Sequence, residues 1–207
     1  MNRPQTILSI TFFFSICLMF VSATFAQTDP RYKIEPNHEA VLHVVLGSSE
    51  AAQDGGLPQS LSGISKQLRA NFAFTNYKLV NTYLGRIANT GNLDYKSIAN
   101  IYAQEPETDT PSFLDWRLID LRSSQSAAGQ NVFQIQSFRF GARVPIKSAG
   151  IRDESGKSTA VINYESVGLT LDKISFSENS PTLIGTLSLP KPSGTMFLVL
   201  TVKGVGN

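Results

Sequence analysis

The sequence predicts a β-rich α+β fold, with mainly antiparallel sheets arranged like a sandwich and one helix near residues 58–70. Three observations predict it. Apolar and polar residues alternate with a period of two over much of the chain, as half-buried strands require. Turn-forming Gly, Pro and Asn residues separate these runs at short intervals. Only one segment has helical spacing. With 42% apolar and 16% charged residues, the composition is typical of a folded domain rather than a disordered segment.

Residues 1–26 have the three regions of a signal peptide. Arg3 gives the positive start, Ile7 to Val21 is apolar and uncharged, and Thr24-Phe25-Ala26 resembles a cleavage site. The apolar run is shorter than the roughly 20 residues that a membrane span needs, so an uncleaved anchor is the less favoured alternative. Cleavage would remove the one cysteine, Cys17, and a thiol-free chain suits an oxidising compartment. We therefore expect an exported protein, periplasmic or extracellular, with a bacterial envelope favoured.

Residues 27–104 are predicted to form an N-terminal β-α-β-β region. The first strand is a β-branched run ended by Gly47, and the helix has apolar residues at spacings of four, three and four after Pro58. Two further strands flank a turn at Asn89–Asn92. On the first of these we expect four residues to share one face: Tyr77, Leu79, Asn81 and Tyr83. The predicted elements are a strand over Ala40–Leu46, a helix over Leu57–Leu68, and strands over Phe72–Leu84 and Leu93–Gln104.

Residues 112–207 are predicted to form a C-terminal antiparallel region, either packed with the first region as one domain or separate from it. The acidic, proline-containing segment 105–111 is the candidate boundary. A long strand is predicted over Val132–Val144. In it, Phe133 and Ile135 would share one face, and Phe138 and Phe140 would share the other. This change of face predicts a bulge near Gln136-Ser137. Further strands are predicted around Leu114–Leu118 and over Thr159–Tyr164, Val167–Phe176, Leu183–Leu189 and Met196–Val202. The strand over Met196–Val202 is so apolar that we expect it to be central in a sheet or covered by other elements.

Three motifs resemble catalytic or binding motifs but depart from them. His38 and His43 flank a glutamate as in zinc proteases, yet they are five residues apart instead of four, which separates their faces on a helix or a strand. Gly156-Lys157-Ser158 has Ile151 where a phosphate-binding loop needs glycine. Asp115 and Asp120 are also five apart, so we expect them on opposite strand faces. A Ser-His-Asp arrangement using His43 remains open, because triad members can be distant in sequence.

A loose basic stretch gives the best candidate for a partner or ligand surface. Arg139 and Arg143 begin it, and Phe138 and Phe140 are interleaved with them. Such a stretch could bind an anionic polymer or lipid headgroups, although a solvated strand face explains it more simply. Trp116 is added because aromatic residues, with Tyr77 and Tyr83, could line a ligand cavity; the alternative is that these three belong to the core. The candidate surface is therefore Arg139, Arg143, Phe138, Phe140 and Trp116.

The segment Ile162-Asn163-Tyr164-Glu165-Ser166-Val167-Gly168-Leu169-Thr170-Leu171 resembles part of the β-domain of the secretin family, the outer-membrane channels of bacterial secretion and pilus systems. There, an apolar-aromatic strand continues into a Val-Gly-hydrophobe-x-Leu strand. Gly63 to Leu84 also resembles small exported proteins found beside such systems. The departure is Asp172-Lys173, which follows where the family has proline. The resemblance implies a soluble accessory of an envelope assembly, and it carries over no catalytic residue.

The charge balance and the cysteine count exclude several of the remaining classes of function. The 18 basic and 16 acidic residues give a chain near neutrality, which argues against a nucleic-acid partner. A single cysteine excludes disulfide scaffolds and cysteine-based zinc sites, and we expect no cofactor or metal. We expect an exported, non-catalytic envelope protein that binds a protein partner, by addition of a strand to a sheet edge or as an assembly accessory. The alternatives are a small exported hydrolase and a ligand-binding domain.

Overall fold

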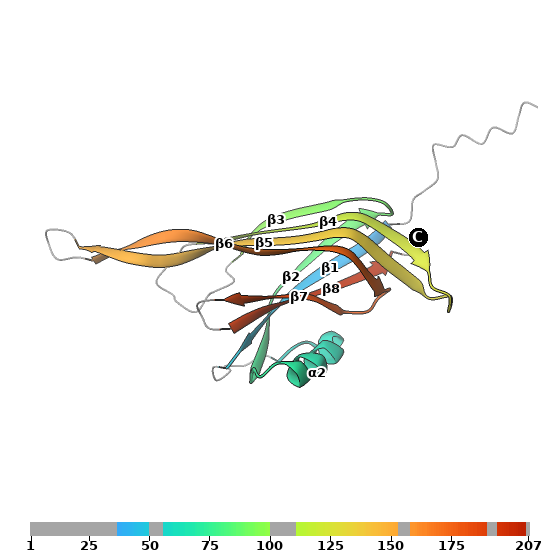
Figure 1. The fold of residues 1–207 in the computed structure, drawn as a ribbon, viewed down its shortest axis with the longest axis horizontal. Coiled ribbons are helices and arrows are strands. Elements are labelled where there is room, and N and C mark those ends of the chain that lie inside the picture. The colour runs from blue at the N-terminus through green and yellow to red at the C-terminus, as the bar shows by residue number, and fades with distance from the viewer. Residues whose placement is uncertain (1–36, 50–55, 100–110, 153–157, 190–193, 206–207) are drawn as a thin grey trace, which may run out of the picture. The chain divides into compact units, whose positions relative to one another are not determined.

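Two antiparallel sheets of four strands each form the body of the protein in a computed structural model (Figure 1). The structure describes residues 37–49, 56–99, 111–152, 158–189 and 194–205, all within one compact unit, 36–207. The predicted signal peptide, segment 105–110 and Gly156-Lys157 lie outside the described residues. The elements are β1 Asn37–Ser48, the 3-10 helix η3 Gln59–Leu61, α2 Ser62–Asn71, β2 Asn76–Ala88, β3 Leu93–Ala99, β4 Ser112–Gln125, β5 Asn131–Arg152, β6 Ser158–Ser177, β7 Thr182–Leu189 and β8 Gly194–Gly204.

The strand order confirms the predicted fold class. Sheet A has the order β2-β1-β8-β7 and sheet B the order β3-β4-β5-β6. Both predicted regions contribute to both sheets, because β1 pairs with β8 in sheet A and β3 pairs with β4 in sheet B. The predicted strand over Met196–Val202 is indeed central, since β8 lies between β1 and β7.

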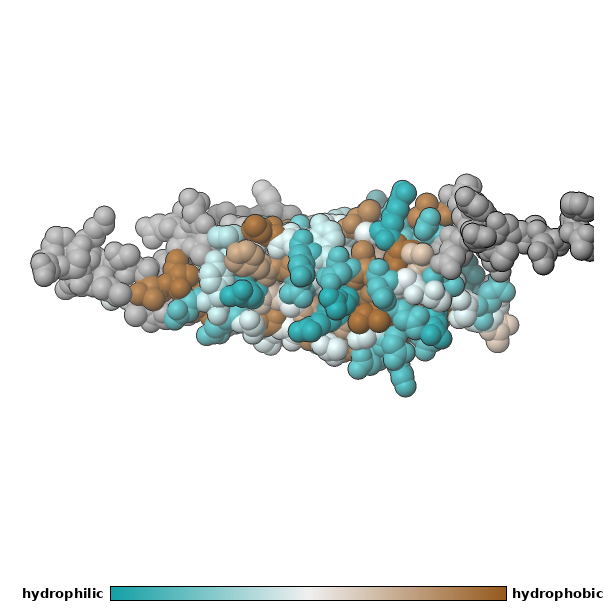
Figure 2. Space-filling view, turned by 90° about the horizontal axis from the view of Figure 1, so that it is seen from above, coloured by the Kyte–Doolittle hydropathy of each residue, from teal (hydrophilic) through white to brown (hydrophobic). Residues whose placement is uncertain are grey.

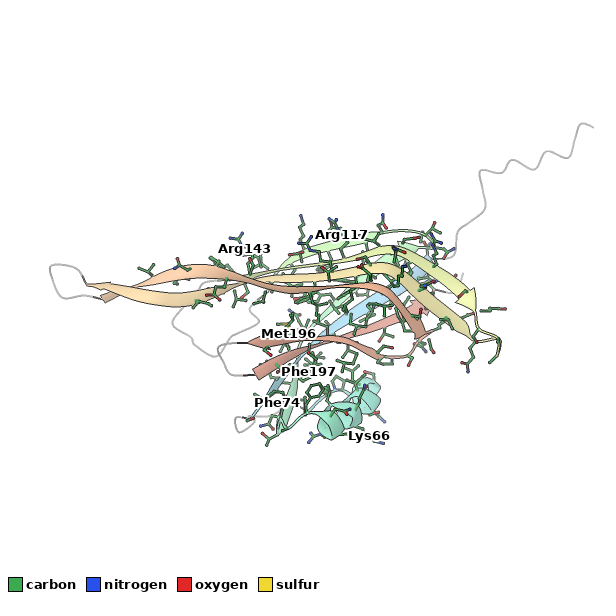
Figure 3. All side chains as sticks on the ribbon, in the orientation of Figure 1. Lys66, Phe74, Arg117, Arg143, Met196 and Phe197 are labelled. Carbon is green, nitrogen blue, oxygen red and sulfur yellow. The ribbon has the colours of Figure 1, made fainter. Side chains whose placement is uncertain are left out.

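The main core lies between the two sheets. Alternate side chains of the central strands point into it, and the largest of them come from sheet B: Trp116, Phe133, Phe138 and Phe140. From β8, Met196 and Leu198 face this core, while their neighbour Phe197 faces the other side of sheet A (Figure 3). Because successive strand residues alternate between faces, a continuous apolar strand such as β8 can serve two cores.

The predicted helix covers the outer face of sheet A. Its stripe of Leu61, Ile64 and Leu68 packs against Phe197 and Tyr77 in a second hydrophobic cluster. The Tyr77 hydroxyl donates to the carbonyl oxygen of Leu68 at 3.0 Å, beside the Phe72 backbone N–H that donates to the same oxygen at 2.9 Å, and so ties the C-terminus of α2 to β2. The layers are therefore helix, sheet A and sheet B.

Phase shifts change two of the predicted faces. In β2 the register with β1 skips Val80, so Tyr77 packs under α2 while Tyr83 packs between the sheets, contrary to the single face predicted. In β5 a phase shift occurs at Gln136-Ser137, as predicted. It does not place the two pairs of side chains on opposite faces, however. All four side chains face the main core, because the extra residue returns the second pair to the inward face: Phe133, Ile135, Phe138 and Phe140.

The shift in β5 belongs to a kink that crosses three strands. The pairing of β4 with β5 and of β5 with β6 omits Asp120, Gln136 and Lys173, and we call these three residues the kink. Asp120 and Lys173 have left-handed backbone angles, with φ of 53° and 55°. On the two strands that flank β5, core-facing residues are spaced by three across the kink: the buried Leu118 and Leu121 on β4, and the partly buried Leu171 and Ile174 on β6. The strands thus change phase together, and sheet B bends without losing its register (Figure 1).

Candidate binding surface

The outer face of sheet B carries an exposed row of apolar, aromatic and basic side chains. Strand register aligns Ile98 of β3 with Phe113 of β4, and Phe113 with Arg143 of β5. Ile98 is 68% exposed and Phe113 is 40% exposed. Tyr164 of β6 completes the set, which we call the aromatic–arginine row: Ile98, Phe113, Arg143 and Tyr164. Figure 2 looks onto this side and shows hydrophobic side chains among hydrophilic ones.

Ring contacts hold the aromatic–arginine row together. The rings of Phe113 and Tyr164 are 5.7 Å apart between centroids, and the Arg143 guanidinium lies 5.6 Å over the Tyr164 ring. At an exposed site such a cation–π contact contributes about 0.5–1 kcal/mol. The Tyr164 hydroxyl donates to the carbonyl oxygen of Pro111 at 3.0 Å, which ties β6 to the residue preceding β4. These contacts position Phe113, Arg143 and Tyr164 before any partner binds.

A second row of charged side chains runs parallel to the first. Register places Asp94, Arg117 and Arg139 side by side, and Arg117 forms an ion pair with Asp94. Arg139 has no ion pair with any residue that the structure describes. Figure 3 shows Arg117 and Arg143 projecting from the same side of sheet B, away from Met196. This face thus offers cationic groups beside exposed aromatic rings.

A pair of opposed glycines separates the two rows. Gly141 and Gly168 are register partners at outward positions. A Cβ atom at Gly141 would lie 2.8 Å from an Asp115 carboxylate oxygen, and one at Gly168 would lie 2.5 Å from the Phe140 carbonyl oxygen. The second contact involves backbone, which cannot move aside, so this position requires glycine. Asp115 lies over the strip that the glycines leave.

The structure divides the predicted candidate surface in two. Arg139 and Arg143 are exposed on the outer face, whereas Phe138, Phe140 and Trp116 are at most 1% exposed and belong to the main core. The prediction was wrong for these three aromatic residues, because neighbours on a strand point to opposite faces. The alternative interpretation of Trp116, Tyr77 and Tyr83 is confirmed instead of a ligand cavity: all three are core residues, and Tyr77 lies in a different cluster from the other two. Sequence reasoning missed Phe113 as a surface residue. The alternation of Leu114 and Trp116 places Phe113 on the opposite, outward face of the strand, and this pattern could have identified it.

The two histidines point to opposite faces of β1, as their spacing predicts. His38 is 4% exposed and meets the Phe133 ring edge-on at 4.8 Å, and its ring nitrogens have no hydrogen-bond partner in the described part of the chain. Burial lowers the pKa of His38, and the nearby Glu178 carboxylate opposes this shift. His43 lies on sheet A with its Nδ1 3.0 Å from the Thr82 hydroxyl oxygen, and burial lowers its pKa too.

Neither the histidines nor the acids gather into a catalytic or metal centre within the described ranges. No group of three potential metal ligands lies together among those residues. The His43–Thr82 contact joins register partners of β1 and β2, the ordinary cross-strand pair of a sheet. Asp115 and Asp120 both point outward, contrary to the opposite faces predicted, because Asp120 is itself the residue at which the alternation of β4 is interrupted. Asp120 is occupied by an ion pair with Arg122 at 2.7 Å.

Comparison with known proteins adds no relative to this description. No protein-family model matches the chain, and no curated protein matches it significantly. In the segments that the structure describes, none of the helices has the length and apolar character needed to cross a membrane. The class of molecule is thus defined by the fold alone, as a β-rich sandwich with one covering helix.

Proposed function

We propose that this chain is an exported, non-catalytic protein of the bacterial envelope that binds a protein partner through the outer face of sheet B. The observation that carries the proposal is the aromatic–arginine row, which is exposed and yet ordered by its own contacts. Aromatic residues and arginine are enriched at protein interfaces and among the residues that contribute most to binding. Export is supported by the signal-peptide pattern of residues 1–26.

A two-stranded ribbon beside the row enlarges the available surface. β5 pairs with β4 only as far as Arg143, whereas its pairing with β6 continues to Arg152 and Ser158. Figure 1 shows this ribbon leaving the sheet. The nine residues of β5 beyond Arg143 span about 30 Å at about 3.3 Å per residue. A ribbon of two strands gains little stability alone, so docking on a partner would stabilise it.

The edges of sheet B offer a way to extend the interface. β3 and β6 are the two end strands of the sheet order. An end strand can accept a strand from another chain, with backbone hydrogen bonds giving affinity and side-chain contacts giving specificity. Ile98 lies on β3 and Tyr164 on β6, so a partner strand added at either edge would reach one end of the aromatic–arginine row.

Position-specific crosslinking in intact cells tests the proposal. A photoreactive residue would replace Ile98 in the row, and a matched control would replace Lys66, an exposed residue of α2 on the sheet A side (Figure 3). Captured proteins would be identified by mass spectrometry. We expect one envelope protein to be crosslinked from position 98 and not from position 66. Equal capture from both positions, or recovery of the chain alone, would contradict the proposal.

A further inference from the structure

A polar pocket opens on the outer face of sheet B at the kink. Its volume is about 240 Å³, and it is lined by Asp120, Arg122, Gln134, Gln136 and Lys173. Pockets for drug-sized ligands have volumes of roughly 300–1,000 Å³, so this one is of a size for a single small ring. None of the described residues that line it is apolar, which indicates a ligand recognised by hydrogen bonds and charge.

The pocket results from the coordinated phase shift and not from loose packing. The kink turns two consecutive rows of sheet B outward, so that Asp120, Gln136 and Lys173 add side chains where a regular sheet would bury them. Left-handed backbone costs roughly 1–2 kcal/mol at most residues other than glycine, such as lysine, and less at aspartate, whose short polar side chain can hydrogen-bond locally. Asp120 and Lys173 both have it, on the two strands that flank β5. Strain of this kind is found preferentially at sites with a function.

Hydrogen bonds from the neighbouring turn fix the pocket wall. The Asp120 backbone N–H donates to the Asn92 side-chain oxygen at 2.9 Å. The Thr90 N–H donates to the Leu121 carbonyl oxygen at 2.6 Å, and the Leu121 N–H donates to the Gly91 carbonyl oxygen at 3.2 Å. The turn thus continues sheet B beside the kinked part of β4. A site held in this way loses little entropy when a ligand binds.

The charges of the pocket leave one cation unpaired. Arg122 donates to both carboxylate oxygens of Asp120, at 3.0 Å from Nε to Oδ1 and 2.7 Å from Nη2 to Oδ2. These two charges offset one another and orient the remaining guanidinium donors. Lys173 makes no ion pair with any residue in the described ranges. The pocket therefore carries a net charge of +1 from one carboxylate and two cations.

We infer that this pocket binds a hexuronate, a sugar ring bearing a carboxylate. The ammonium of Lys173 provides the counter-charge for the ligand carboxylate. The amides of Gln134 and Gln136 both donate and accept hydrogen bonds, as neighbouring hydroxyl groups of a sugar require. The same chemistry occurs in a free sugar acid and in a residue of an acidic polysaccharide. This site is separate from the aromatic–arginine row and does not depend on the proposed protein partner.

Titration of the isotope-labelled full chain tests the inference, with backbone amide shifts as the readout. The probes are sodium D-glucuronate, an oligomer of galacturonate, and D-glucose as a neutral control. We expect saturable shifts at residues 120–122, 134–136 and 173 with the acidic probes, and at least tenfold weaker binding of glucose. Tighter binding of the oligomer assigns the site to a polysaccharide, and equal binding per site assigns it to a free sugar acid; either result supports the inference.

Two variants make the test specific. Lys173→Gly removes the ammonium and keeps the left-handed backbone, which glycine adopts without strain, so the fold is retained. We expect it to weaken glucuronate binding at least tenfold, while Lys96→Ala, a matched loss of an exposed lysine outside the pocket, changes it less than twofold. Absence of saturable shifts with both acidic probes, equal binding of glucose, or unchanged binding by Lys173→Gly would each overturn the inference.

Discussion

Replacement of Phe197 by alanine should release α2 from sheet A. Phe197 is fully buried on the helix side of β8, and its ring centroid lies 4.8 Å from that of Phe72, 5.8 Å from Tyr77 and 6.1 Å from Phe74. A buried Phe→Ala change costs about 3–5 kcal/mol, a large part of the roughly 5–15 kcal/mol by which a domain is stable. Because these contacts join the helix and its following segment to the sheet, the loss should be local first.

Met196 provides the control for this prediction, because it is the neighbouring residue of β8 and faces the main core. Met196→Ala should cost about 2–5 kcal/mol but act on the packing between the sheets. Urea unfolding gives the free energies, and hydrogen exchange gives their location. We expect Phe197→Ala to lower the protection of α2 amides more than that of β4 and β5, and Met196→Ala not to do so. Retained protection of α2 in Phe197→Ala would refute the three-layer description.

Two other predictions concern pH and glycine. The pKa of folded His38 is lowered by burial below the 6.5 of an unperturbed histidine, so its neutral form adds no pH dependence above pH 6.5. As pH falls from 6.5 toward the lowered pKa, protonation of His38 favours the unfolded state, so the free energy of unfolding decreases. His38→Leu should reduce the dependence of this free energy on pH between pH 7 and 5. An unchanged pH dependence would count against the burial of the His38 ring. In urea titrations, Gly168→Ala should destabilise the protein by about 1–3 kcal/mol, because the added Cβ would clash with backbone. Gly63→Ala, in open space on α2, should stabilise it by up to about 1 kcal/mol. Equal effects of the two substitutions would contradict these placements.

The sequence contains enough information for the fold class and for most elements. The alternation of Leu114, Trp116 and Leu118 identifies β4, and the helical spacing from Leu57 to Leu68 identifies the helix. Each of these signals is local, so a few residues suffice. It is harder to predict which face of a sheet a residue occupies beyond a phase shift, because one extra residue moves every later side chain of that strand to the opposite face. This is why Tyr77 and Tyr83 were predicted together although they lie in different clusters.

The candidate surface was predictable only in part for a related reason. The exposure of Arg139 and Arg143 follows from the strand pattern of β5 itself. The contact of Phe113 with Tyr164 depends instead on the register of three strands, which no local pattern determines. The pocket at the kink is similar, since Asp120 and Lys173 line one pocket only when all three strands change phase at one level.

The affinity of the crosslinked partner for variants of the aromatic–arginine row tests the central claim most directly. Phe113→Ser and Arg143→Ala would be compared with Lys66→Ala, which removes an exposed cation from the sheet A side. Truncation of a residue that contributes strongly to an interface costs about 1.4 kcal/mol or more, which is a tenfold loss of affinity. We predict at least this loss for the two row variants and no change for Lys66→Ala. Equal affinities for all three variants would contradict the assignment of the partner surface to sheet B.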